Sequence, residues 1–398
     1  MKKAFVIGTC DTKFDELNYA RKLINRAGIG TVLVDVGSMG HSHPVDITNY
    51  EVASFHPDGA NFLVDPTDRG ATVSAMGIAL ERFLLSRDDV GGVLGMGGSG
   101  NTSLVTQGMR CLPIGTPKVM VSTMGSGDIA PYVGPNDICM VYSVTDIAGL
   151  NSISRKVIGN AAHGLAGMMN CAVPEVLEEK PLLGLSMFGV TTPCVEMVRE
   201  ILGDEYECMV FHATGTGGMS LEKLVDSGMV SSVLDVTLTE ICDYLMGGVL
   251  SAGEDRLGAF IRTGIPYVGS VGAQDMVNFG PIDTVPEKYS DRTLYVHNPQ
   301  VTLMRTTVDE NEAMGRWIGN KLNRFTGPVR FLLPEKGVSM IDAPGMPFYD
   351  PEADEALFCT LEETFIQTDT KRILRLPYHI NDREFAEALV ANFRAISK

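Results

Sequence analysis

The densest chemical signal in the sequence is a glycine-rich stretch, Gly95-Met-Gly-Gly-Ser-Gly-Asn-Thr-Ser-Leu104, which follows the apolar run 90–96. It has the Gly-x-Gly-x-x-Gly spacing of a dinucleotide-binding turn, and it lies between a predicted strand and a predicted helix. Such a turn lets the backbone approach a phosphate, whose oxygens can bind the free amides and hydroxyls that follow. The residues that would do so are Gly97, Gly98, Ser99, Gly100, Thr102 and Ser103. A plain strand-to-helix connection is the alternative, and a P-loop is excluded because no lysine follows the last glycine.

Related signals follow three neighbouring predicted strands. Gly8-Thr-Cys-Asp-Thr-Lys13 follows the first strand, and Ser122-Thr-Met-Gly-Ser-Gly-Asp128 follows the fourth. Asp35 ends the second strand, where a ribose-binding acid is expected in a nucleotide-binding sheet. Because the carboxyl ends of parallel strands share one edge, these loops can converge on a single ligand. The residues predicted to shape that site are Gly8, Thr9, Asp11, Lys13, Asp35, Ser126 and Gly127, with Lys13 as the positive charge.

The second half of the chain repeats the theme in two glycine-rich turns, at 212–220 and 267–275. The first of them, His212-Ala-Thr-Gly-Thr-Gly-Gly-Met-Ser220, again follows a predicted strand and opens a predicted helix. These turns could form a second anion pocket, the other wall of the first site, or plain connections. The sequence leaves all three alternatives open.

Acid–base chemistry has its own candidates in the second half. Glu240 lies near a predicted helix start, where a carboxylate can act as an acid or a base, although helix N-termini favour acids anyway. His212 ends an apolar strand and is the histidine best placed for proton transfer. Arg305 could clamp a carboxylate or a phosphate. As an alternative function, these three residues predict a metabolic enzyme that acts on a small carboxylate or acyl substrate in an interdomain cleft.

Two α/β domains would position these residues. Short apolar runs alternate with longer amphipathic stretches, which is the pattern of a parallel sheet with crossover helices. The predicted strands are 4–7, 31–36, 90–96, 118–123 and 138–143, followed by 182–188, 208–213, 232–236, 267–271, 294–297 and 330–334. Predicted helices include one that Asp11 would cap, and others at 69–86, 151–170 and 307–325. The segment 171–181 breaks both periods, so we predict Rossmann-like domains at 1–175 and 182–398, each with a mostly parallel sheet flanked by helices.

Charge and composition narrow the classes of partner. A formal net charge of −17 argues against broad contact with nucleic acid or anionic membranes, because both need a positive surface. No uncharged run of about 20 apolar residues is present, and the apolar start of the chain is too short for a signal peptide. The 8 cysteines show no zinc-site spacing and are expected to be reduced thiols. We therefore expect a cytoplasmic protein without nucleic-acid or membrane partners.

Several motifs resemble those of a known family. They are Phe5-Val-Ile-Gly-Thr-Cys-Asp-Thr-Lys13, Gly95-Met-Gly-Gly-Ser-Gly-Asn-Thr-Ser103, Ser122-Thr-Met-Gly-Ser-Gly-Asp128, Gly247-Gly-Val-Leu-Ser-Ala-Gly253 and Leu332-Leu-Pro-Glu-Lys-Gly-Val-Ser339. The chain is similar, over essentially its whole length, to the ATP-binding family that includes the N-terminal region of the tomato mosaic virus resistance protein. The resemblance implies two Rossmann-like domains, ATP binding, and self-association as a homodimer or a higher homo-oligomer.

The leading prediction is therefore a protein that binds ATP with Mg²⁺ at the glycine-rich edge of its first domain. If ATP is turned over, Mg²⁺ held by Asp11 or Asp128 would neutralise the phosphates, and the second domain would supply an acceptor or an activated water. A nucleotide-sensing interaction module without turnover is a further alternative. A nicotinamide dehydrogenase is less expected, because Asp35 belongs to a different turn from the Gly-x-Gly-x-x-Gly pattern.

Overall fold

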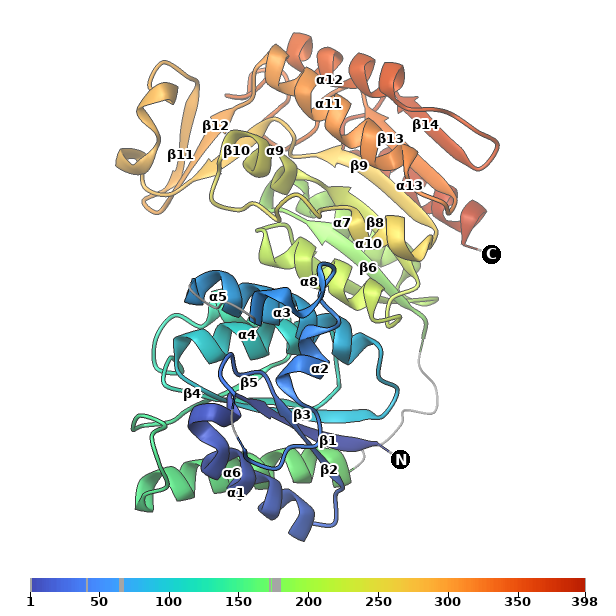
Figure 1. The fold of residues 1–398 in the computed structure, drawn as a ribbon. Helices are drawn as coiled ribbons and strands as arrows, with labels where there is room; N and C mark the ends of the chain where they lie inside the picture. The colour runs from blue at the N-terminus through green and yellow to red at the C-terminus, as the bar shows by residue number, and fades with distance from the viewer. Residues whose placement is uncertain (1, 41, 64–67, 172, 174–179, 398) are drawn as a thin grey trace. The chain divides into compact units, whose positions relative to one another are not determined.

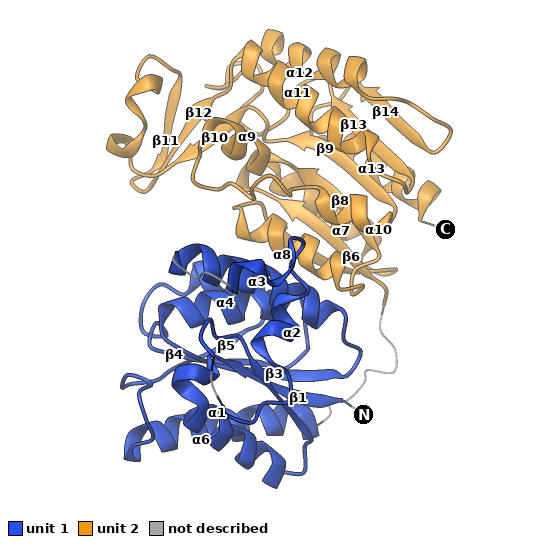
Figure 2. Cartoon of the chain, viewed as in Figure 1, with its two compact units in different colours: residues 1–175 blue, residues 176–398 orange. Residues whose placement is uncertain are grey.

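The computed structural model describes residues 2–40, 42–63, 68–171, 173 and 180–397. The chain divides into two compact units, residues 1–175 and 176–398 (Figure 2). The predicted domain boundary within 171–181 lies mostly outside the described residues. Each unit has its own parallel sheet flanked by helices, which confirms the predicted α/β class with two Rossmann-like units.

The first unit is built on a five-stranded sheet whose neighbouring strands are all parallel (Figure 1). Its strand order is β2-β1-β3-β4-β5. The strand that follows β1 in the chain is added on one side of the sheet, and the strands that follow β3 are added on the other side. The strands are β1 (Lys3–Gly8), β2 (Thr31–Asp35), β3 (Val90–Gly97), β4 (Lys118–Ser122) and β5 (Cys139–Tyr142). The five strands predicted for this half are confirmed.

Helices cover both faces of this sheet, which is why its strands are apolar on both sides. The helices are α1 (Cys10–Arg26), α2 (Asn49–Ala53), α3 (Arg69–Leu85), α4 (Ser99–Arg110), α5 (Ala130–Val133) and α6 (Ser152–Asn170), with a 3-10 turn at Gly59–Leu63. Ala4 and Val6 pack against α1 and α6, whereas Phe5 and Ile7 pack against α3 and α4. The N-cap of α1 is Thr9 rather than the predicted Asp11, which lies inside the first turn.

The second unit repeats this plan with six parallel strands. Their order is β14-β13-β9-β8-β6-β7. Read from β7, the strands β7-β6-β8-β9-β13 correspond to β2-β1-β3-β4-β5 of the first sheet, and β14 is an additional strand at the edge. The strands are β6 (Leu182–Met187), β7 (Glu207–His212), β8 (Ser232–Thr237), β9 (Tyr267–Gly272), β13 (Val329–Pro334) and β14 (Lys371–Leu376). One face packs against α7 (Thr192–Leu202) and α13 (Arg383–Ile396). The other face packs against α8 (Thr216–Asp226), α9 (Thr239–Met246), α10 (Gly258–Thr263), α11 (Val308–Asn323) and α12 (Pro351–Thr364).

The predicted strand at 294–297 exists but does not join the parallel series. It is β11 (Leu294–Asn298), which pairs antiparallel with β12 (Val301–Arg305) in a three-stranded sheet that also contains β10 (Met276–Phe279). Further 3-10 turns lie at Gly189–Thr191, Ile282–Thr284 and Glu287–Tyr289. The last elements, α12, β14 and α13, were not predicted from the sequence. Among the helices in the described ranges, none is long and apolar enough to cross a membrane.

Candidate functional site

The first unit contains a cavity of about 600 Å³ at the carboxyl ends of β1 and β3. The strand order reverses between these two strands, and open parallel sheets bind ligands at such switch points. The cavity is lined by the turns after β1 and β2, by the first two turns of α3, by the start of α4, and by Asp146. The structure therefore brings together parts of three predicted strand-end turns.

The turn between β3 and α4, which we call the cradle (Gly97–Asn101), contributes its residues 98–101 to the lining of this cavity, and Gly97 lies outside the lining. α4 begins at Ser99 with Gly98 as its N-cap, and no side chain of the described residues caps the helix. The first-turn amides therefore lack intrahelical partners, and Gly98, Ser99 and Gly100 line the cavity. Free amides at the positive end of a helix dipole make an anion site.

The glycines of the cradle serve different purposes. A Cβ on Gly97, whose φ is +156°, would lie 2.6 Å from Asn101 Cβ, so glycine permits the tight packing here. A Cβ on Gly98 would have only Thr123 Oγ1 within 4 Å, at 3.7 Å, and one on Gly100 would meet nothing within 4 Å. Side chains at these two positions would enter the cavity rather than collide with the protein.

Of the three hydroxyl residues predicted on α4, only Ser99 lines the cavity. Thr102 is buried, and its hydroxyl oxygen lies 2.8 Å from the Gly98 carbonyl oxygen and 2.6 Å from Ser122 Oγ. Ser103 is exposed and lies outside the lining. Thr102 therefore stabilises the cradle from behind and does not face a ligand.

The turn after β1 supplies the neighbouring part of the lining. Gly8 is buried, and a Cβ there would lie 2.9 Å from Leu17 Cδ2, so this glycine allows α1 to pack closely. Thr9 and Thr12 line the cavity, and their hydroxyl oxygens lie 3.1 Å apart. Sequence reasoning indicated Thr9 but missed Thr12, although both lie in the same glycine-led turn.

Among the described residues, two cations and two carboxylates belong to the lining. Lys13 has non-helical backbone angles that kink α1, and its Nζ donates a hydrogen bond to the carbonyl oxygen of Ile147. Arg69, at the start of α3, is the second cation and was not predicted. The carboxylates are those of Asp11, which was predicted, and Asp146, which was not.

Asp35 and Asp11 lie near one another but have different partners. Asp35 is buried, and its Oδ1 accepts hydrogen bonds from Cys10 N at 2.8 Å and Gly37 N at 2.9 Å, so it ties two turns together. Asp35 is not part of the cavity lining, whereas Asp11 is. Asp11 Oδ2 accepts a hydrogen bond from Met39 N at 3.3 Å, and its Oδ1 has no donor within the described part of the chain. Burial, together with these two negative charges, raises the pKa of the Cys10 thiol, which disfavours a thiolate nucleophile here.

Apolar side chains form a chemically distinct part of the lining. They are Val36 and Met39 after β2, Val73 and Met76 on α3, and Leu104 on α4. The contact between α3 and α4 brings the α3 side chains close to the cradle. This contact cannot be predicted from a local sequence pattern. A phosphate ion needs no such surface, whereas an organic ligand can bury apolar area against it.

The turn after β4 contributes less than predicted. Ser126, Gly127 and Asp128 are exposed and lie outside the lining of the cavity. Asp128 Oδ1 accepts a hydrogen bond from Ala130 N at the start of α5. Only the beginning of this turn reaches the cradle, where Thr123 N donates to the Gly97 carbonyl.

The structure separates the two predicted metal ligands. Asp11 lines the cavity and Asp128 does not, while Asp146 provides a second carboxylate there. Within the ranges that the structure describes, no three His, Cys, Asp or Glu side chains are grouped to hold a metal ion. A cation held by the described residues at this site would therefore need further ligand atoms, from water or from a bound ligand.

The glycine-rich turn after β7 in the second unit already holds an anion, the carboxylate of Glu240. Glu240 Oε1 accepts hydrogen bonds from Gly215 N at 2.7 Å and Gly218 N at 3.0 Å, at the start of α8. A Cβ on Gly218 would lie 2.1 Å from Glu240 Oε2, so glycine is needed to admit this carboxylate. At the β6/β8 switch point, the side chains of Thr191 and Thr237 are fully buried and their hydroxyl oxygens lie 2.7 Å apart, so protein atoms occupy this position.

Glu240 belongs to a buried ion-pair network centred on Arg256. The guanidinium lies 2.8 Å from Glu240, 2.8 Å from Asp235 and 3.0 Å from Glu222. Tyr267 adds a hydrogen bond from its hydroxyl to Asp235 at 3.0 Å. Burial raises the pKa of Glu240 and of Glu222, although Arg256 opposes the shift. Glu240 is fully enclosed and paired, so its position offers a substrate no access.

The other two acid–base candidates have separate surroundings. Arg305 is buried, and it donates hydrogen bonds to Asp354 Oδ1 at 2.8 Å and to the Phe348 carbonyl oxygen at 2.7 Å. His212 is exposed, with its Nδ1 3.2 Å from the carbonyl oxygen of Met187. No hydrogen bond or ion pair in the described part of the chain joins His212, Glu240 and Arg305.

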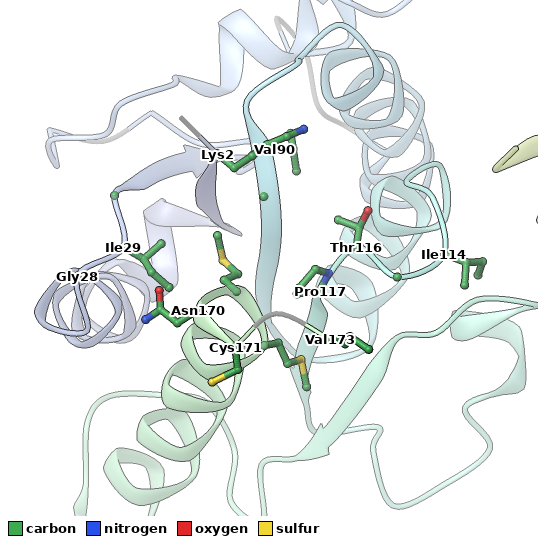
Figure 3. Close-up of a pocket in the computed structure, with 15 residues that line it drawn as sticks. Lys2, Gly28, Ile29, Val90, Ile114, Thr116, Pro117, Asn170, Cys171 and Val173 are labelled. Atoms are coloured by element: carbon green, nitrogen blue, oxygen red, sulfur yellow. The ribbon is translucent and has the colours of Figure 1, made fainter. Parts of the chain in front are cut away.

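A larger cavity of about 720 Å³ lies at the opposite edge of the first sheet, near the amino ends of β1 and β3 and the end of α6 (Figure 3). Lys2 is the one charged residue in its described lining, which otherwise contains residues such as Ile29, Pro117 and Met169. Ligands of open parallel sheets bind at the carboxyl ends of the strands instead. We therefore place the candidate site at the smaller cavity, on the basis of its chemistry.

Comparison with known proteins places both units in one family. The profile for the N-terminal domain of an uncharacterised protein family, UPF0261, matches residues 2–174, and the profile for its C-terminal domain matches residues 180–397. The UPF0261 protein RA0729 of Rhizobium meliloti is 57% identical over 397 residues, covering 100% of both chains. The UPF0261 protein of Clostridium tetani is 47% identical, over 98% of this chain and 97% of that protein.

A plant protein and an archaeal structure extend the comparison. The ToMV resistance protein Tm-1(GCR237) of Solanum lycopersicum is 43% identical over 99% of this chain, and the match covers 56% of the tomato protein. The crystal structure of Methanocaldococcus jannaschii UDP-GlcNAc 2-epimerase, in complex with UDP-GlcNAc and UDP, aligns at 8% identity and a TM-score of 0.23 over 99% of this chain and 92% of that chain. A likeness this low carries no argument about fold or ligand.

Proposed function

The chain belongs to the uncharacterised protein family UPF0261, and we propose that it binds a nucleotide, ATP with Mg²⁺, in the cavity of its first unit. The observation that supports the proposal is the two-part lining at the β1/β3 switch point, where free amides adjoin apolar side chains. A nucleotide joins a phosphate chain to a base, which are the groups that these two surfaces suit. The choice of ATP rests on the motifs that resemble an ATP-binding family.

The phosphate chain would lie against the first turn of α4. Gly98 and Gly100 leave room for it, and the amides of Ser99 and Gly100 would donate to its oxygens. Lys13 and Arg69 would add positive charge, with Lys13 exchanging the Ile147 carbonyl for a phosphate oxygen. Such local donors can hold an anion on a protein whose net charge is −17.

The residues present fit Mg²⁺ as an ion shared with the phosphates. Mg²⁺ typically binds to proteins through one or two carboxylates, substrate phosphates and water. Asp11 and Asp146 are the carboxylates of the lining, and either can supply one oxygen. Mg²⁺ bound there would neutralise phosphate charge, and it would polarise the phosphoryl group if ATP were turned over.

Calorimetric titration of the full chain with ATP and Mg²⁺ tests the proposal. We expect the wild type to bind and Gly98→Val to bind at least about tenfold more weakly, because its side chain would occupy the phosphate position. Gly189→Val is the matched control, since a Cβ at this exposed position in the second unit meets no described atom within 4 Å. A folded wild type that binds no nucleotide would overturn the proposal.

Turnover needs a separate measurement. The alternative metabolic enzyme built on His212, Glu240 and Arg305 is not favoured by any observation, because Glu240 and Arg305 lie in separate buried ion-pair networks. Steady-state release of phosphate from ATP with Mg²⁺ separates an ATP-dependent enzyme from a nucleotide sensor. Release above the level of Gly98→Val supports turnover, and binding without release supports sensing.

A further inference from the structure

The ribose of the proposed nucleotide has an identifiable partner in the cavity, an inference that rests on the proposed function. The sugar links base to phosphate, so its partner should lie between the apolar lining and the cradle. Asp11 lines the cavity and belongs to the turn after β1, which adjoins the cradle where a Cβ on Gly8 would lie 3.4 Å from Asn101 Nδ2. Its Oδ2 accepts a hydrogen bond from Met39 N, beside the apolar part, and its backbone belongs to the same turn as Thr9 and Thr12.

Asp35 is not free to take this role, although it ends β2, where a ribose-binding acid is expected. It is 1% exposed and lies outside the cavity lining. Its Oδ1 already accepts two backbone hydrogen bonds, from Cys10 and Gly37. A Cβ on Gly37 would lie 3.1 Å from both Asp35 Oδ1 and Asp11 Oδ2, so this glycine lets Asp11 occupy the space beside Asp35.

Asp11 has one carboxylate oxygen without a hydrogen-bond donor. Its Oδ1 is buried and has no partner in the described part of the chain, and Asp11 does not cap α1, whose N-cap is Thr9. A buried acceptor without a donor is costly, so a ligand hydroxyl that reached it would supply the missing partner. A carboxylate is a strong acceptor for hydroxyl donors, and a ribose offers two neighbouring hydroxyls. We propose that Asp11 recognises the 2′- and 3′-hydroxyls of the ribose and makes the site selective for ribonucleotides over deoxyribonucleotides.

Titration of the full chain with ATP, 2′-deoxy-ATP and 3′-deoxy-ATP, each with EDTA and with Mg²⁺, tests this assignment. We expect the wild type to bind ATP about tenfold or more tightly than the deoxy analogues, because a hydroxyl missing from a polar site leaves an acceptor unpaired. Asp11→Ala should weaken ATP binding and abolish the preference. Asp11→Asn keeps the shape and an acceptor, and should retain part of it. Asp15→Ala, an exposed acid of the same helix outside the lining, should bind like the wild type.

Each contrary outcome has a distinct meaning. Equal affinity of the wild type for all three nucleotides would overturn the ribose assignment and leave the nucleotide site standing. A preference for ATP that survives in Asp11→Ala would also overturn it. Weakening by Asp11→Ala that appears only with Mg²⁺ would make Asp11 a metal ligand and overturn it as well. A folded wild type that does not bind ATP would overturn both the assignment and the proposed function.

Discussion

Gly97 and Gly98 are neighbours in the cradle, but only Gly97 is required by the packing of the protein. We expect Gly97→Ala to lower the free energy of unfolding by about 1–3 kcal/mol, because its Cβ would lie 2.6 Å from Asn101 Cβ. Gly98→Ala should change it by less than about 0.5 kcal/mol, because the position is open. Urea unfolding monitored by circular dichroism measures both changes. A loss for Gly98→Ala as large as that expected for Gly97→Ala would mean that Gly98 variants do not report on ligand binding alone.

We expect Asp354 and Asp275 to make the free energy of unfolding depend on pH in the neutral range. Burial and the neighbouring Asp342 raise the pKa of Asp354, and burial raises the pKa of Asp275, although Arg305 opposes both shifts. The folded state therefore keeps protons that the unfolded state releases above about pH 4. The stability that these groups contribute is present at low pH and is lost as the pH rises through the raised values.

We accordingly expect the melting temperature of the second unit to fall between pH 6 and pH 8, by an amount equivalent to about 1–2 kcal/mol. Asp354→Asn should flatten this dependence, because an amide resembles the neutral carboxyl group and can still accept the hydrogen bond from Arg305. Differential scanning calorimetry at pH 6, 7 and 8 measures the slope, with the exposed Asp369→Asn as the control. An unchanged slope in Asp354→Asn would contradict this origin of the pH dependence.

At the scale of elements, Glu240 joins the start of α8 to α9 and to Arg256 in the loop before α10. We expect Glu240→Ala to lower the free energy of unfolding by about 3–5 kcal/mol. The substitution would remove the hydrogen-bond acceptor of the Gly215 and Gly218 amides and one of the negative charges around the buried Arg256. Glu196→Ala is a suitable control, because its ion pair with Arg199 is exposed and should contribute less than about 1 kcal/mol. Chemical unfolding of both variants measures the two free energies of unfolding. A loss for Glu240→Ala as small as that of the control would contradict a stabilising role of the Arg256 network.

The sequence predicted most strands of the two parallel sheets because a strand covered on both faces is an uninterrupted apolar run. It predicted β11 as a strand but placed it in the parallel series, because a short apolar run does not indicate which sheet a strand joins. The two-residue connection Pro299-Gln300 has the length of a hairpin turn, and it is the signal from which β12 could have been predicted.

The candidate site was predictable in part, for a related reason. Thr9, Asp11, Lys13 and the cradle stand out locally, because glycines, acids and hydroxyls follow strand ends. Met76 looks like any core residue of a helix, and it reaches the cavity only through the strand order and the contact of α3 with α4. Non-local packing of this kind has no counterpart in a local sequence pattern.

At the scale of the whole chain, the repeated strand order suggests two binding sites, but the second is filled by the protein itself. Thr191 and Thr237 occupy its switch point, and Glu240 occupies its glycine-rich turn. We expect one nucleotide per chain, measured as the stoichiometry of the calorimetric titration. Gly98→Val should lower that occupancy towards zero, and a wild-type value near two would show that the second unit opens to a ligand.

The carboxylate of Glu240 can also be regarded as a ligand that is covalently tethered to its own receptor. Glu240→Ala would remove this carboxylate and leave a space beside the amides of Gly215 and Gly218 and the guanidinium of Arg256. A small carboxylate such as acetate could then act as a removable side chain, and it would raise the melting temperature of the variant in proportion to its occupancy. Chemical rescue of this kind would make the stability of the second unit depend on the concentration of an added carboxylate.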